Sequence, residues 1–60
     1  MPKVLIIDDE KSIRRSLREI MEFEKFTVDE AEDGQSGFNK ITSETYDLVL
    51  CDVKMPKLDG

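Results

Sequence analysis

The residues LVLCD at positions 48–52 decide the fold and the candidate site of this chain. They form a short apolar run that ends in a carboxylate, and a run of aliphatic residues this short is typical of a buried strand. Desolvating a carboxylate costs free energy unless a metal ion, a cation or hydrogen bonds replace the lost water. Asp52 is therefore the first candidate for chemistry.

A second run of the same kind stands near the start of the chain. Residues 4–9 read VLIIDD, so Asp8 and Asp9 follow a predicted buried strand just as Asp52 does. In an open parallel sheet, ligands bind outside the carboxyl ends of the strands. If the two runs are neighbouring parallel strands, Asp8, Asp9 and Asp52 meet at one edge of the sheet.

The periodicity of apolar residues predicts five elements in the order strand, helix, strand, helix, strand. They cover residues 3–8, 11–24, 25–31, 33–42 and 46–52. Short connections between alternating strands and helices are typical of right-handed βαβ units and a parallel sheet. We expect the spatial order 2-1-3, with the two helices on opposite faces, and we expect Asp9 to be the N-cap of the first helix.

Composition excludes several classes of protein. Sixty residues allow one small domain with little core, the single cysteine cannot form an internal disulfide, and no histidine is present for a zinc site. A net charge of -5 argues against a nucleic-acid-binding surface. No apolar stretch approaches the roughly 20 residues that span a bilayer, and the start lacks a signal pattern. A cytoplasmic protein without membrane contact is our expectation.

Several residues outside the acidic set are expected to have structural roles. Cys51 is expected to be a buried small hydrophobe, and Tyr46 to pack with its hydroxyl in water. Basic residues in the first helix are interpreted as a solvated face because acidic residues alternate with them. They are Lys11, Arg14, Arg15 and Arg18.

Three carboxylates crowded at one edge repel one another unless a cation neutralises them. Carboxylate and carbonyl oxygens suit Mg²⁺, which keeps open positions for phosphoryl oxygens. We expect one of Asp8 and Asp9 to bind the ion directly and the other through water, Asp52 to bind it and act as a nucleophile, and a carbonyl near Lys54 to add an oxygen. The alternative is structural, since aspartates in such places are often helix caps or turn formers.

Three segments of the chain resemble a known family. Residues 4–10 (VLIIDDE), 31–37 (AEDGQSG) and 47–60 (DLVLCDVKMPKLDG) closely resemble the N-terminal half of a bacterial two-component response-regulator receiver domain. The resemblance covers residues 1–60, up to the loop after the third strand. It implies a truncated flavodoxin-like (CheY-like) three-layer α/β sandwich, βαβαβ with a parallel sheet of order 2-1-3.

The resemblance also implies roles for individual residues. Asp52 corresponds to the phosphoacceptor, Asp9 and Asp52 to direct Mg²⁺ ligands, the Lys54 carbonyl to the third protein ligand, and Asp8 to an acid beside this set. The implied activity is acceptance of a phosphoryl group from a sensor histidine kinase, and the chain is not expected to be an enzyme.

Receivers of this family have five βα units. Their switch hydroxyl after the fourth strand and their lysine after the fifth have no counterpart in these 60 residues. We therefore expect the isolated chain to bind Mg²⁺ weakly and to be phosphorylated poorly, whereas the full-length parent should do both.

Two other functions stay open. The 60 residues could act as a structural fragment that self-associates through the open edge of the third strand, because unpaired edge amides invite pairing with another chain. A phosphatase-type enzyme could use Asp52 as a transient nucleophile. That chemistry requires a carboxylate two residues later as general acid and base, but Lys54 occupies this position.

Overall fold

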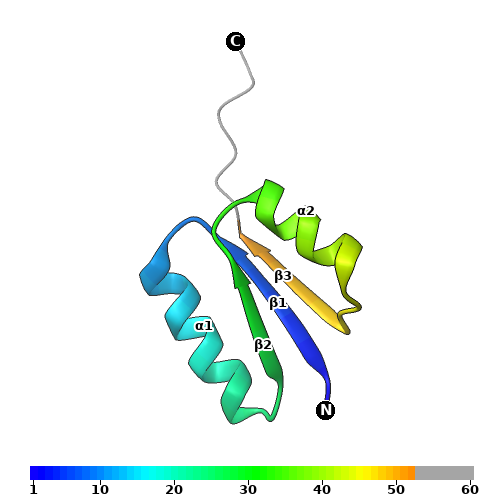
Figure 1. The fold of residues 1–60 in the computed structure, drawn as a ribbon. Coiled ribbons are helices and arrows are strands. Elements are labelled where there is room, and N and C mark those ends of the chain that lie inside the picture. The colour runs from blue at the N-terminus through cyan, green and yellow to red at the C-terminus, as the bar shows by residue number, and fades with distance from the viewer. Residues whose placement is uncertain (53–60) are drawn as a thin grey trace.

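The structure is a computed structural model that describes residues 1–52, with Asp52 described by its backbone alone. It contains the five expected elements in the expected order (Figure 1). They are β1 (Lys3–Asp8), α1 (Lys11–Phe23), β2 (Thr27–Ala31), α2 (Gly34–Ser43) and β3 (Leu48–Asp52). The second and third strands each begin two residues later than the sequence predicts.

The three strands form one parallel sheet in the order β2-β1-β3, as predicted. β1 is the central strand, so it is paired on both sides and its residues from Val4 to Asp8 are all buried. The register aligns Ile7 with Ala31 of β2 and Asp8 with Asp52 of β3. The carboxyl ends of β1 and β3 therefore lie next to each other.

Alternate residues of β1 build two small cores on the two faces of the sheet. On one face, Val4 and Ile6 pack with Val28, and α1 covers this face with Leu17 and Met21. The other face carries a separate core, made of Leu5, Ile7 and Ala31 with Tyr46 packed against it.

Gly37 of α2 lies against Ile7 on this second face. The two helices thus lie on opposite faces of the sheet, which confirms the three-layer arrangement (Figure 1).

The predicted N-cap of α1 was wrong. Glu10, not Asp9, is the N-cap residue, and its side chain does not cap the helix. The Glu10 amide instead donates to Asp8 Oδ1 at 2.9 Å, so the first carboxylate of the acidic pair closes the turn. In α2, the side chain of Asp33 accepts from the Ser36 amide at 2.7 Å, and this bond lowers the pKa of Asp33.

Cys51 is exposed, which corrects the expectation that it is a buried hydrophobe. Among the described elements, β3 pairs with β1 alone, and neither helix packs against it. Leu48 and Val49 of the same strand are 38% and 39% exposed for this reason. Self-association through this edge stays a prediction.

The hydroxyl of Tyr46 does not lie in water, contrary to expectation. Tyr46 reaches across the sheet and donates to Asp29 Oδ2 of β2 at 2.7 Å. Burial, followed by this hydrogen bond, raises the pKa of Tyr46. Lys3 Nζ lies 5.1 Å from the centre of the tyrosine ring and pairs with Glu44 and Asp29, so a polar cluster closes the amino-terminal end of the sheet.

Candidate functional site

The candidate site lies at the carboxyl edge of the sheet, where β1 and β3 end together. The register pairs Asp8 with Asp52, as expected from two parallel neighbours. The side chain of Asp52 and all of Lys54 lie outside the described residues. Their predicted roles therefore stay predictions, while the backbone places the two strand ends side by side.

Asp8 is a buried carboxylate, with 1% of its surface exposed. Its Oδ1 accepts the hydrogen bond from Glu10, but its Oδ2 has no hydrogen-bond partner among the described residues. A buried carboxylate oxygen without a partner carries the full cost of desolvation. This orphaned oxygen fits a hard cation such as Mg²⁺, which prefers carboxylate oxygens as ligands.

Asp9 is exposed on the turn that follows β1. Within the described side chains, no three acidic, cysteine or histidine residues gather as a metal site. Asp52 is not among those side chains, so the structure describes one half of the predicted ligand set. That half consists of a buried acid and an exposed acid next to it.

Sequence reasoning missed Arg14. Its Nη1 donates to the backbone carbonyl of Asp8 at 2.7 Å, and its Nε donates to Glu30 Oε1 of β2 at 3.1 Å. Arg18 Nη1 donates to the other oxygen of Glu30 at 2.6 Å. The prediction of a solvated basic face is wrong for Arg14, whose side chain is 14% exposed, and holds for Lys11 and Arg15.

A signal for this contact was present in the sequence. Glu30 stands two residues after Val28, and alternate residues of a strand share a face, so Glu30 falls on the face that α1 covers. A carboxylate on a covered face needs a cation from the covering helix. Arg14 and Arg18, four residues apart on α1, supply two.

Glu30 gives the fold a specific pH dependence. Its hydrogen bond from Arg18, followed by that from Arg14, lowers the pKa of Glu30. A group whose pKa is lowered by folding stabilises the fold above its unfolded pKa, and that stabilisation is lost as the pH falls through the folded pKa. The contribution is therefore complete above the ordinary glutamate pKa of 4.5 and fades below it.

We expect Glu30→Gln to lower the free energy of unfolding by about 1 kcal/mol at neutral pH, because the pair is only partly shielded from water. The difference from the unsubstituted chain should shrink in acid, where Glu30 is protonated. Urea unfolding at several pH values measures it, with Glu19→Gln on the exposed side of α1 as the matched control. A difference that does not change with pH would contradict the assignment.

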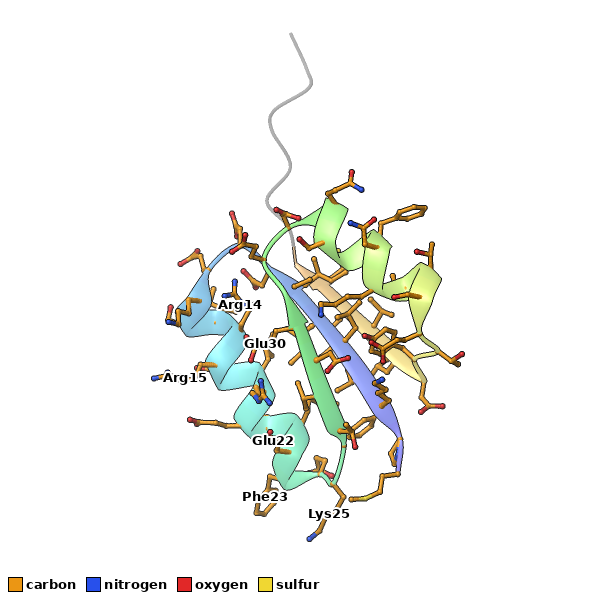
Figure 2. The ribbon with its side chains drawn as sticks, viewed as in Figure 1. Arg14, Arg15, Glu22, Phe23, Lys25 and Glu30 are labelled. Atoms are coloured by element: carbon orange, nitrogen blue, oxygen red, sulfur yellow. The ribbon has the colours of Figure 1, made fainter. Side chains whose placement is uncertain are left out.

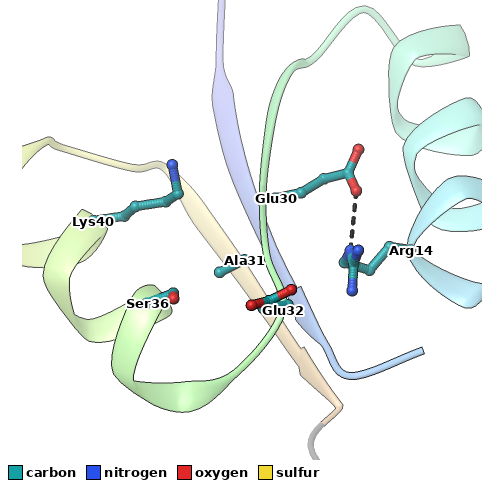
Figure 3. Close-up of a pocket in the computed structure, with 6 residues that line it drawn as sticks. All are labelled: Arg14, Glu30, Ala31, Glu32, Ser36 and Lys40. Atoms are coloured by element: carbon teal, nitrogen blue, oxygen red, sulfur yellow. Dashed lines mark hydrogen bonds and ion pairs between the residues drawn. The ribbon is translucent and has the colours of Figure 1, made fainter. Parts of the chain in front are cut away.

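A shallow pocket of about 260 Å³ lies at the carboxyl end of β2 (Figure 3). Arg14 and Glu30 line it on the α1 side of the sheet, and Ser36 and Lys40 line it from α2. Asp8, which carries the orphaned oxygen, does not line this pocket. We therefore assign the pocket no part in the chemistry of the acidic edge.

Comparison with known proteins identifies the family. The family model described as response regulator receiver domain matches residues 4–60. The chain belongs to this receiver family. The transcriptional regulatory protein ResD of Bacillus subtilis is 47% identical over 58 residues, which are 97% of this chain and 24% of that protein.

Two further relatives agree. The response regulator ArlR of Staphylococcus saprophyticus is 40% identical over 60 residues, which are 100% of this chain and 27% of ArlR. The gliding motility regulatory protein of Myxococcus xanthus is 41% identical over 58 residues, which are 97% of this chain and 8% of that protein. The receiver chain thus spans about a quarter or less of these curated relatives, and no solved structure matches it significantly.

Neither helix of the described residues has the length and apolar character needed to cross a bilayer.

Proposed function

We propose that this receiver chain accepts a phosphoryl group on Asp52 from a sensor histidine kinase, with Mg²⁺, as part of two-component signal transduction. One observation carries the proposal: Asp8, a buried acid with an oxygen that has no hydrogen-bond partner among the described residues, is in register with Asp52 at the end of the neighbouring strand. Burying a carboxylate costs free energy unless a cation or hydrogen bonds compensate it, so the position of Asp8 beside Asp52 supports a cation site at this edge.

Asp8, Asp9, Asp52 and the backbone carbonyl of Lys54 would hold the proposed ion, directly or through water. When bound, it offsets the repulsion between a carboxylate and an anionic phosphoryl group. An oxygen of Asp52 forms the new bond to phosphorus while the bond from phosphorus to the kinase histidine nitrogen breaks, and that nitrogen leaves with the electron pair. The product is an acyl phosphate on Asp52, so the chain is a phosphoacceptor and not a turnover enzyme.

The experiment uses the full-length protein that carries this receiver. Incubation with acetyl phosphate and Mg²⁺ should add the mass of one phosphoryl group, and Asp52→Asn should abolish the addition. Asp47→Asn is the matched control, because Asp47 immediately precedes the opposite end of the same strand. No mass change in the unsubstituted protein, or an unchanged one in Asp52→Asn, would refute the proposal.

The proposal includes the partners and the location. A sensor histidine kinase is the proposed phosphoryl donor, and a second copy of the chain is a proposed partner at the edge of β3. We also propose that this segment contacts neither nucleic acid nor a membrane directly. Its net charge of -5 argues against a surface that binds nucleic acid. A cytoplasmic location is proposed with it.

A further inference from the structure

The turn between β1 and α1 carries two of the three acids of the proposed metal site, Asp8 and Asp9, and hydrogen bonds among the described residues hold it. The Glu10 amide donates to Asp8 Oδ1, the Arg14 amide donates to the Glu10 carbonyl at 3.0 Å, and Arg14 Nη1 donates to the Asp8 carbonyl. Arg14 contributes two of these bonds, one through its backbone amide and one through its guanidinium. Its guanidinium reaches back from α1 to the last residue of β1.

Glu30 holds the guanidinium in place from the neighbouring strand. Arg14 Nε donates to Glu30 Oε1 (Figure 3). Arg18 Nη1 donates to the other oxygen of the same carboxylate. We call the contacts of Arg14 with Glu30 and with the Asp8 carbonyl the Arg14 clamp. A planar guanidinium suits such a clamp, because its donors have a fixed geometry.

We propose that Arg14 is a positioning residue for the acidic edge. The clamp keeps the Asp8–Glu10 turn in the arrangement in which the carboxylates of Asp8 and Asp9 can bind a divalent cation. This inference rests on the proposed function for its link to Mg²⁺. The positioning of the turn itself rests only on the contacts of the described residues.

The charge of Arg14 and its positioning of the turn have opposite effects on Mg²⁺ affinity. A cation close to an acidic site repels Mg²⁺, so removing the charge alone would strengthen metal binding. Groups that orient metal ligands typically change metal affinity about tenfold or more when they are removed. The sign of the change in Mg²⁺ affinity therefore separates a positioning role from a purely electrostatic one.

Arg15 provides the matched control. It is the next residue on α1 and carries the same charge, but it is exposed and points away from the sheet (Figure 2). Arg15→Met removes the same charge from the neighbouring position of α1 without touching the clamp. Met21→Ala is a second control, because Met21 packs on the core from the same helix and its loss lowers stability without altering the turn.

The test compares Arg14→Met, Arg14→Lys and the two controls in the full-length protein. Residue-resolved hydrogen exchange of the Glu10 amide reports on the turn, and calorimetric titration reports Mg²⁺ affinity. We expect Arg14→Met to speed exchange of that amide about tenfold, since a hydrogen bond to a charged group is lost. Mg²⁺ affinity should fall about tenfold.

Arg14→Lys should change exchange and Mg²⁺ affinity in the same direction as Arg14→Met. Lysine keeps the charge but lacks the several donors in fixed geometry with which a guanidinium binds two acceptors. Arg14→Lys also replaces Arg14→Met should that variant not fold. Arg15→Met should keep the unsubstituted exchange rate at Glu10 and at least the unsubstituted affinity, and Met21→Ala should speed exchange at Glu10 no more than at other amides of the fold.

Unchanged exchange in both Arg14 variants, or tighter Mg²⁺ binding in Arg14→Met, would overturn the inference. Should the unsubstituted protein bind no Mg²⁺, the proposed function fails, and the exchange data alone still decide whether Arg14 positions the turn.

Discussion

Ile6→Ala is expected to lower the free energy of unfolding by about 3 kcal/mol, because it leaves a cavity where the sheet meets α1. Ile6 is 0% exposed in the central strand and belongs to the core that Leu17 and Met21 cover. A chain of 60 residues buries little apolar surface, so its stability has no reserve to absorb this loss. Most Ile6→Ala molecules should be unfolded under conditions in which the unsubstituted chain is folded.

Ile20→Ala is the matched control for this prediction. Ile20 lies on α1 but is 57% exposed, so the same change should alter the free energy of unfolding by only about 0.5 kcal/mol. Urea unfolding followed by circular dichroism compares the two variants. Equal losses would mean that the core does not lie between β1 and α1.

Gly37→Ala is expected to destabilise the fold by about 2 kcal/mol, although alanine is the better helix former. Gly37 is the buried residue of α2 and lies directly against Ile7 of β1. A Cβ atom at this position would collide with Ile7 Cδ1 and would lie 2.9 Å from Ile7 Cγ1. The Ile7 side chain or the helix would have to move to make room.

Two further variants test this explanation. Gly34→Ala, at the start of the same helix, should be tolerated or stabilising, because a Cβ there meets nothing within 4 Å. Ile7→Val removes Cδ1 and should recover part of the loss when it is combined with Gly37→Ala. Additive effects in this double-mutant cycle would contradict direct contact between the two residues.

Much of the fold could be predicted from periodicity alone. The apolar runs of β1 and β3 and the helical spacing of Leu17 and Met21 are local patterns, and they define the element order and the parallel sheet. The meeting of β1 and β3 at one edge follows from that topology, so the pairing of Asp8 with Asp52 was also predicted. The resemblance to a receiver domain was confirmed by the family model that matches residues 4–60.

Four details could not be read from local patterns. Whether Asp8 or Asp9 accepts a hydrogen bond at the start of α1 depends on the path of the turn. Whether Arg14 faces water or binds Glu30 depends on how α1 docks on β2. Tyr46 meets Asp29 across the sheet. Cys51 is of a residue type that is usually buried, but it is exposed because it lies on a strand that no described helix covers.

The sequence by itself determined the α/β order, the two carboxylates at neighbouring strand ends and the family, because these depend on residue types at short, regular spacings. Only the tertiary structure decided that Asp8 is buried, with one oxygen that has no partner among the described residues, and that Arg14 binds the Asp8 carbonyl. Hydrogen bonds between distant segments depend on how the helices dock. Docking geometry is set by side-chain volume and packing across the whole sheet, which no local pattern specifies.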